Sequence, residues 1–172
     1  TQVGGLSMGS RNVQDGIALF NIAEGALNEV NAMLQRMREL SIQASNDTLT
    51  STDRTFIQAE VTQLTSEIDR IVGGAQYNRM SLLNGDAPWG TGDGGILHIG
   101  ANSNPDEDII QFRIDSIDTA SIGIATTDIS LTAQSSATAA ISALDNALMS
   151  VNTLRANIGA IINRLEHALT SQ

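Results

Sequence analysis

The sequence contains no cysteine, which excludes disulfides and metal sites built from thiolates. Aromatic residues make up only 3% of the chain, so a hydrophobic core has to be built from aliphatic side chains and methionine. Basic residues are few, with 9 against 19 acidic ones. The resulting net charge of −10 argues against a nucleic-acid partner, because such binding rests on neutralising phosphates. No run of about 18 apolar residues is present, so we predict no membrane insertion, and no signal peptide is visible.

Apolar residues instead recur three and four positions apart from residue 13 to about residue 44, which predicts one long helix. This spacing is an a/d seam, and a second apolar row at seven-residue intervals lies beside it. Two adjacent rows need neighbours on two sides, so we predict that the helix lies inside a bundle. The seam consists of Phe20, Ala23, Leu27, Val30, Leu34, Met37, Ser41 and Ala44, and the second row of Leu19, Ala26, Met33 and Leu40.

The same spacing predicts two further helices. One runs from about residue 52 to 71, after the capping residues 51–53 and before the pair Gly73 and Gly74. The other starts near Ser135 or Ser136 and continues to the end of the chain. The seam of the second helix consists of Ile57, Val61, Leu64, Ile68 and Ile71. The two rows of the third consist of Ile141, Leu144, Leu148, Val151, Ile158, Ile162, Leu165 and Leu169, and of Ala140, Ala147, Leu154, Ile161 and Ala168.

The middle of the chain has a different composition. Residues 73–95 are rich in glycine, which predicts turns. Short strands are predicted at 96–99 and 109–114, joined by a turn into a β-hairpin. Residues 115–136 are rich in Ser, Thr and Asp, and we predict a surface connection there. Residues 1–12 contain three glycines, each costing roughly 1 kcal/mol relative to alanine in a helix, so they are helical only if they pack against something.

Together these patterns predict a mainly α fold. We expect an elongated, rod-like bundle of three long helices, two N-terminal and one C-terminal, with a small β-hairpin region. We predict a single domain over residues 1–172, with N-terminal helices in 1–72, a turn-rich hairpin and short connection in 73–136, and the last helix in 137–172. Both ends are still in helical phase, so we expect the chain to be part of a longer protein.

No pattern of catalytic or metal-binding residues is present. His98 and His167 are far apart and neither has a histidine or cysteine at metal-ligand spacing. The glycine-rich run at 92–95 lacks the lysine of a phosphate-binding loop, and the acidic run at 106–108 lacks the spacing of a calcium loop. We therefore predict a protein that is not an enzyme and needs no cofactor or metal.

Four polar residues near the end of the first predicted helix, Arg36, Arg38, Glu39 and Gln43, lie off its apolar stripe. Their ordinary interpretation is a solvated face with weak ion pairs, and an interaction surface is the alternative. Small residues on the helices allow another helix to approach closely, either within the bundle or from a partner. They are Gly16, Gly25, Ala156, Gly159 and Ala160.

The sequence resembles bacterial flagellin in a series of motifs that follow the order of that family. In the N-terminal part they are SRNVQDGI at 10–17, AEGALNEV at 23–30, LQRMREL at 34–40, IQAEV at 57–61, EIDRI at 67–71, QYN at 76–78 and IGAN at 99–102. In the last helix they are LRANIGA at 154–160 and NRL at 163–165. A departure is Arg79 after Asn78, where many flagellins have glycine, which puts the local turn in question.

This resemblance implies a flagellin D1 domain, the rod that packs into the filament used for motility, without the terminal D0 helices. Only residues 115–136 stand where other flagellins insert outer domains, so the resemblance is to a short flagellin, such as those of spirochaetes. The implied partners are other flagellin subunits and, for the full-length protein, the flagellar export and capping machinery. The implied location is the extracellular filament, or a periplasmic flagellum in a spirochaete.

The resemblance also implies recognition of the monomer by Toll-like receptor 5, through a face that makes protofilament contacts in related flagellins. The residues that match this face are Gln35, Arg36, Arg38, Glu39, Leu40, Ile42, Gln43 and Glu60. Two alternatives stay open at this point. One is the hook–filament junction protein, which shares the architecture, and the other is a helical binding module unrelated to flagella. The intact receptor-type motif and the run at 155–164 favour flagellin.

Overall fold

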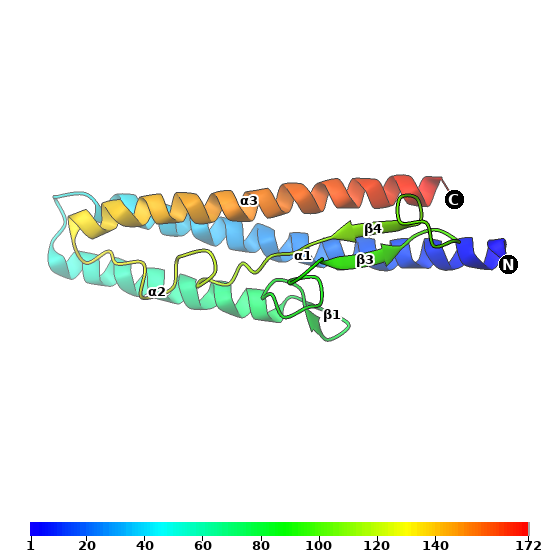
Figure 1. Ribbon diagram of the computed structural model, residues 1–172. Coiled ribbons are helices and arrows are strands. Elements are labelled where there is room, and N and C mark those ends of the chain that lie inside the picture. The colour runs from blue at the N-terminus through cyan, green and yellow to red at the C-terminus, as the bar shows by residue number, and fades with distance from the viewer. Residues whose placement is uncertain (172) are drawn as a thin grey trace.

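The computed structural model describes residues 1–171, and three long helices dominate it (Figure 1). Helix α1 spans Gln2–Ala44, α2 spans Ser51–Gly74 and α3 spans Gln134–Thr170. α1 and α3 lie antiparallel along most of a rod, and α2 packs beside them over one half of it (Figure 1). At about 1.5 Å per residue, α1 alone is about 65 Å long. The predicted mainly α fold, an elongated helical bundle with a small hairpin region, is confirmed.

The predicted seam of α1 forms the centre of the core. All eight seam residues are buried, as are Leu19 and Leu40 of the second row, whereas Ala26 and Met33 are half-buried. The Phe20 ring is fully buried and packs edge-on against Phe112, with the ring centroids 4.9 Å apart. The heptad spacing therefore identified the buried residues of α1 from Leu19 onward, and Gly9, Val13 and Gly16 extend the buried line toward the N-terminus.

The buried lines of α2 and α3 differ from the predicted seams. On α2, Thr65 is buried and Leu64 is only half-buried; the Thr65 hydroxyl donates to the Val61 carbonyl at 2.9 Å, so its burial leaves no polar atom unpaired. On α3 the buried residues form one line, the contact line, which runs between the two predicted rows and takes residues from both. Leu148 lies beside this line and is only half-buried. The small residues of this line let α1 approach closely. Its members are Ala137, Ala140, Leu144, Ala147, Val151, Leu154, Ile158 and Leu165.

This register predicts different costs for two leucines one turn apart on α3. Leu144→Ala removes a fully buried side chain and is expected to lower the free energy of unfolding by about 2–5 kcal/mol. Leu148→Ala, at a half-buried position, is expected to cost about half as much. Urea unfolding of the two variants measures the difference. Equal losses would show that the contact line follows the predicted row instead.

The loop between α1 and α2 is closed by side-chain hydrogen bonds to the backbone. Thr50 is the N-cap, one residue before the predicted cluster, and forms a capping box with Asp53. The hydrogen bonds from Thr50 hold the pKa of the Asp53 carboxyl below its ordinary value. The Arg54 guanidinium donates to the carbonyls of Ala44 and Asn46, both at 2.9 Å, and so satisfies groups that the end of α1 leaves unpaired.

Two small antiparallel hairpins follow α2. Strands β1 (Gln76–Tyr77) and β2 (Met80–Ser81) are joined by Asn78 and Arg79, with φ of 52° and 65°. Positive φ at both loop residues is the type I′ turn that matches strand twist, so Arg79 adopts the conformation that glycine usually supplies.

Strands β3 (Gly95–His98) and β4 (Ile109–Phe112) form the predicted hairpin, in the register Gly95↔Phe112. The segment that follows β3 lies against α1, where a Cβ added at Gly5 would stand 2.9 Å from the Cβ of Ala101. This close approach explains why α1 continues through its N-terminal glycines.

The connection over residues 115–136 is not the surface segment that we predicted. The backbone of this connection runs alongside α2 (yellow-green in Figure 1), and three of its four isoleucines and its leucine are buried. Two side chains of α2 fix its backbone. Asp69 accepts from the Thr119 amide and hydroxyl at 2.9 and 2.8 Å, and Gln58 accepts from the Leu131 amide at 2.6 Å. The buried members are Ile117, Ile124, Ile129 and Leu131.

Candidate interaction face on the first two helices

The outward side of α1 near its C-terminal end carries most of the predicted interface residues. At about 100° per residue, Gln35, Glu39, Ile42 and Gln43 project on the side opposite the seam, and all four are exposed. Ile42 is 47% exposed and is the one apolar side chain among them. The structure thus brings together a polar strip with a single isoleucine.

Arg36 lies at the edge of this strip that borders α2. Its Nε donates to Glu60 at 3.0 Å, and its Nη1 lies 3.5 Å from Glu39. The hydrogen bond and the negative charge of Glu60, followed by those of Glu39, raise the pKa of the Arg36 guanidinium above its ordinary value. The three residues form one exposed ion-pair group that joins α1 to α2, and Arg36 stays charged at every physiological pH.

Arg38 lies at the opposite edge of the strip, beside α3. Its Nε donates to Asp145 at 2.6 Å, and both side chains are partly exposed. The two arginines of the motif therefore reach the two neighbouring helices, one on each side of α1. Both side chains are held by ion pairs within the chain and remain partly exposed.

Leu40 is a correction to the predicted face. It is only 2% exposed and belongs to the core, although the resemblance placed it among the interface residues. The reason is its helical position, about 100° around the axis from Glu39 and toward the contact with α2. The face therefore consists of the other seven residues, Gln35, Arg36, Arg38, Glu39, Ile42, Gln43 and Glu60.

Sequence analysis did not single out Phe56, which is 71% exposed on α2. It is one of three phenylalanines in the chain, and the other two, Phe20 and Phe112, are buried. The only signal for its exposure was its place one residue before Ile57, the first buried residue of α2. Asp145, the partner of Arg38, was also missed, because ion pairs between helices cannot be read from sequence spacing.

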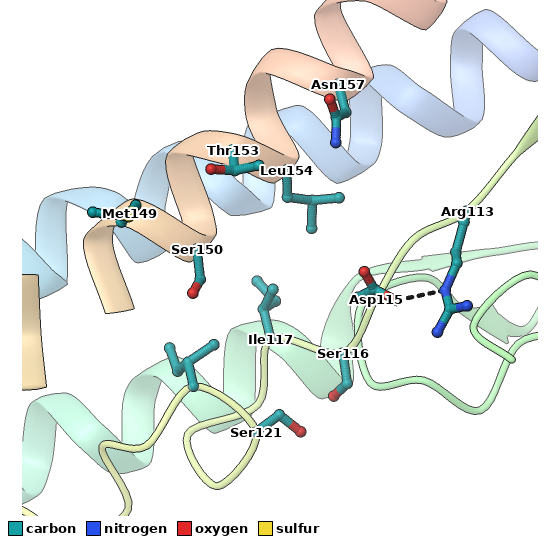
Figure 2. Close-up of a pocket in the computed structure, with 11 residues that line it drawn as sticks. Arg113, Asp115, Ser116, Ile117, Ser121, Met149, Ser150, Thr153, Leu154 and Asn157 are labelled. Carbon is teal, nitrogen blue, oxygen red and sulfur yellow. Dashed lines mark hydrogen bonds and ion pairs between the residues drawn. The ribbon is translucent and has the colours of Figure 1, made fainter. Parts of the chain in front are cut away.

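A groove of about 600 Å³ lies on another side of the rod, between α3 and the segment that leads away from β4 (Figure 2). Leu154 and Ile117 point toward each other across it, and Ser150 and Thr153 line it from α3 (Figure 2). Arg113, at the end nearer β4, pairs with Asp115 at 2.6 Å. The Ser116 hydroxyl in its lining donates to the Asp118 carboxylate at 2.9 Å.

Two of the residues considered for other chemistry, His98 and Asp108, have structural roles. The backbone carbonyl of His98 accepts a hydrogen bond from the side-chain amide of Asn12 at 2.8 Å, which ties β3 to α1. Asp108 is buried and accepts from the Asn104 amide at 2.9 Å, so it organises the hairpin loop. Within residues 1–171, no group of histidine, cysteine or acidic side chains is arranged to hold a metal ion. No helix in that range is long and apolar enough to cross a membrane.

Comparison with known proteins gives consistent matches. The bacterial flagellin N-terminal helical region matches residues 1–87. A flagellin of Halalkalibacterium halodurans is 40% identical over 168 residues, which are 98% of this chain and 59% of that protein. A flagellar filament core protein of Treponema maltophilum is 37% identical over 175 residues, with 96% and 60% covered. The chain thus spans about 60% of the length of these curated relatives. The crystal structure of Bacillus cereus flagellin superimposes with a TM-score of 0.79 at 30% identity, over 95% of this chain and 89% of that one.

Proposed function

The chain belongs to the bacterial flagellin family, and from that premise we propose that it is the rod of a structural subunit that polymerises into a flagellar filament. The observation that carries the proposal is the rod itself, whose core is closed by three helices while polar residues and ion pairs cover its outer faces. Such a rod packs side by side with copies of itself. Repetition of a contact between two different surfaces produces an open helical array.

Several finer features of the subunit belong to the same proposal. We infer that residues 1–172 are a D1-like domain of a longer subunit, which the flagellar export machinery secretes and the capping machinery helps to assemble. The filament is extracellular, or periplasmic if the source is a spirochaete. The similarity to a Treponema filament core protein supports the periplasmic alternative.

We also propose that the monomer is recognised by Toll-like receptor 5 through the seven-residue face on α1 and α2. Arg36 is its central anchor, because its planar guanidinium is held by two carboxylates and partly exposed. Packing of neighbouring rods against the same face would hide it in the filament, so the receptor would detect monomers only.

Arg36→Ala is expected to weaken receptor activation while leaving the fold intact. The exposed ion pairs of Arg36 add little to stability, so the melting temperature should change by no more than about 2–4 °C. Loss of an anchor should raise the half-maximal concentration for receptor activation about tenfold or more. Arg70→Ala is the matched control, because Arg70 is also an exposed arginine paired with a glutamate of its own helix. A collapse of thermal stability, or equal activation by both variants, would remove Arg36 from the receptor face.

Immunogold labelling of native flagella with antibodies against this chain tests the proposed function. A filament subunit is labelled along the whole filament. A hook–filament junction protein is labelled only at the filament base, and a binding module outside the flagellum labels neither. Label confined to the base, or absent from flagella, would contradict the proposal.

A further inference from the structure

The outer side of α2 carries an exposed aromatic residue followed by acidic ones. Phe56, Glu60 and Glu67 recur at spacings of four and seven and so lie along one side of the helix. This side borders the outer face of α1, where Arg36 pairs with Glu39 and Glu60.

Further along the same border, Arg70 pairs with Glu67. The hydrogen bond and charge of Glu67 raise the pKa of the Arg70 guanidinium, and the charge of Glu29 adds to this effect. Together with Arg36, Glu39 and Glu60, these groups make a border of two guanidiniums and four carboxylates. The border is therefore negatively charged.

The groove beside α3 is lined by apolar side chains at one end and by arginines at the other, in contrast to the negatively charged border. Its apolar part is lined by Ile117, Ile122 and Leu154, with the 68% exposed Met149 at the end nearer the start of α3. A second hollow of about 330 Å³ continues it toward the end of α3 and shares Arg113 and Asn157 with it.

That second hollow is lined by Arg113 and Arg164. Arg113 is neutralised by Asp115, whereas Arg164 has no ion pair with the described part of the chain. The continuous groove is therefore apolar at one end and positively charged at the other.

The two surfaces have the same polarity along the rod. α2 and α3 both run from the end with the α1–α2 loop toward the end with the termini, as the colours in Figure 1 show. Phe56 precedes Glu67 by eleven residues, and Thr153 precedes Arg164 by eleven residues, which is about 16 Å of helix in both cases. When rods point in one direction, Phe56 beside Thr153 therefore places Glu67 beside Arg164. The exposed Ala160, between Thr153 and Arg164, leaves room for the approaching helix.

We infer that the occupant of the α3 groove is the outer side of α2 from a second copy of this chain, with Phe56 inserted beside Thr153 and Glu67 paired with Arg164. The inference rests on the proposed filament function and specifies which surfaces meet. Charge complementarity and the common direction of the helices select a second copy over other occupants. The contact joins two different surfaces, so it does not close on itself and propagates as an open array.

Residues 1–172 contain no cysteine, so a cysteine introduced into the rod of the full-length subunit is the only one in this region and can be tested by crosslinking. Phe56→Cys and Thr153→Cys variants are mixed, assembled under polymerising salt and oxidised mildly. A disulfide needs Cα atoms within about 7 Å, so covalent dimers are expected from this pair. Phe56→Cys with Thr138→Cys is the control, because Thr138 is an exposed threonine of the same helix about 22 Å away. No dimers from the first pair in intact filaments, or equal yields from both pairs, would overturn the inference.

A charge exchange tests the second half of the contact. Glu67→Arg and Arg164→Glu should each raise the critical concentration for assembly about tenfold or more, and the double variant should restore it to within about twofold of wild type. Unchanged melting temperatures would show that the folded rod is intact. A double variant as defective as the single ones would overturn the contact while filaments of the wild type keep the proposed function. A wild-type subunit that forms no filaments would overturn both.

Discussion

Replacing Phe20 by alanine is expected to lower the free energy of unfolding by about 3–5 kcal/mol. The side chain is fully buried at the centre of the α1 seam and packs edge-on against Phe112, so the substitution removes a large apolar surface and an aromatic pair. It also leaves a cavity between α1 and the hairpin, which rigid helices cannot close. Chemical denaturation followed by circular dichroism measures the loss.

Phe56→Ala is the matched control for this prediction. The same atoms are removed, but from a side chain that is 71% exposed, so the change in unfolding free energy should stay within about 0.5 kcal/mol. Similar losses in the two variants would mean that Phe20 is not in a packed core, and the register of α1 in the bundle would be wrong.

Gly94→Ala is expected to be the most damaging change outside the helices. Gly94 has φ of +83°, which costs other residues about 1–2 kcal/mol. An added Cβ would also overlap the carbonyl oxygen of Phe112, a backbone atom of the paired strand. The hairpin would have to open at Gly95↔Phe112, beside the Phe20 ring. We expect a total loss of roughly 3 kcal/mol or more in thermal or chemical unfolding.

Gly123→Ala separates the two contributions. Gly123 has φ of +75°, but nothing lies within 4 Å of an added Cβ. Its substitution should therefore cost only the conformational part, about 1–2 kcal/mol. If both alanine variants lost the same amount, the close approach of Gly94 to the opposite strand would have no energetic weight.

The parts of the fold that depend on periodicity could be predicted from the sequence. All eight residues predicted for the α1 seam are buried, because one apolar residue per turn is a strong pattern over a long helix; the buried line also continues back through Val13, Gly16 and Gly9, which the seam did not include. The choice between two rows on α3 could not be made, since alanine at 140 and 147 is compatible with either burial or exposure. Which residues of α3 are buried depends on how α1 packs against it, and the sequence of α3 does not contain that information.

The connection before α3 escaped prediction for a different reason. Residues such as Ile124 and Ile129 have no period, because an irregular segment follows neither the helix nor the strand repeat. Their burial depends on Asp69 and Gln58, which come from a helix about 50 and 70 residues earlier. Such long-range bonds to the backbone leave no local signal.

In the candidate face too, some features could be predicted from the sequence and others could not. The resemblance located Arg36 and Glu60, and the structure shows them hydrogen-bonded at 3.0 Å between two helices. It also included Leu40, which faces the core here, and it gave no place to Phe56 or Asp145. Motif matching transfers positions along the chain, whereas exposure depends on how each helix is turned against its neighbours.

Cryo-electron microscopy of the full-length subunit, assembled in polymerising salt, tests the central claim most directly. The account predicts helical filaments in which this three-helix rod fits the density, all rods point one way, and α2 of one copy lies against the α3 groove of the next. Full-length protein that stays monomeric under these conditions, or a filament whose density does not accommodate the rod, would contradict it.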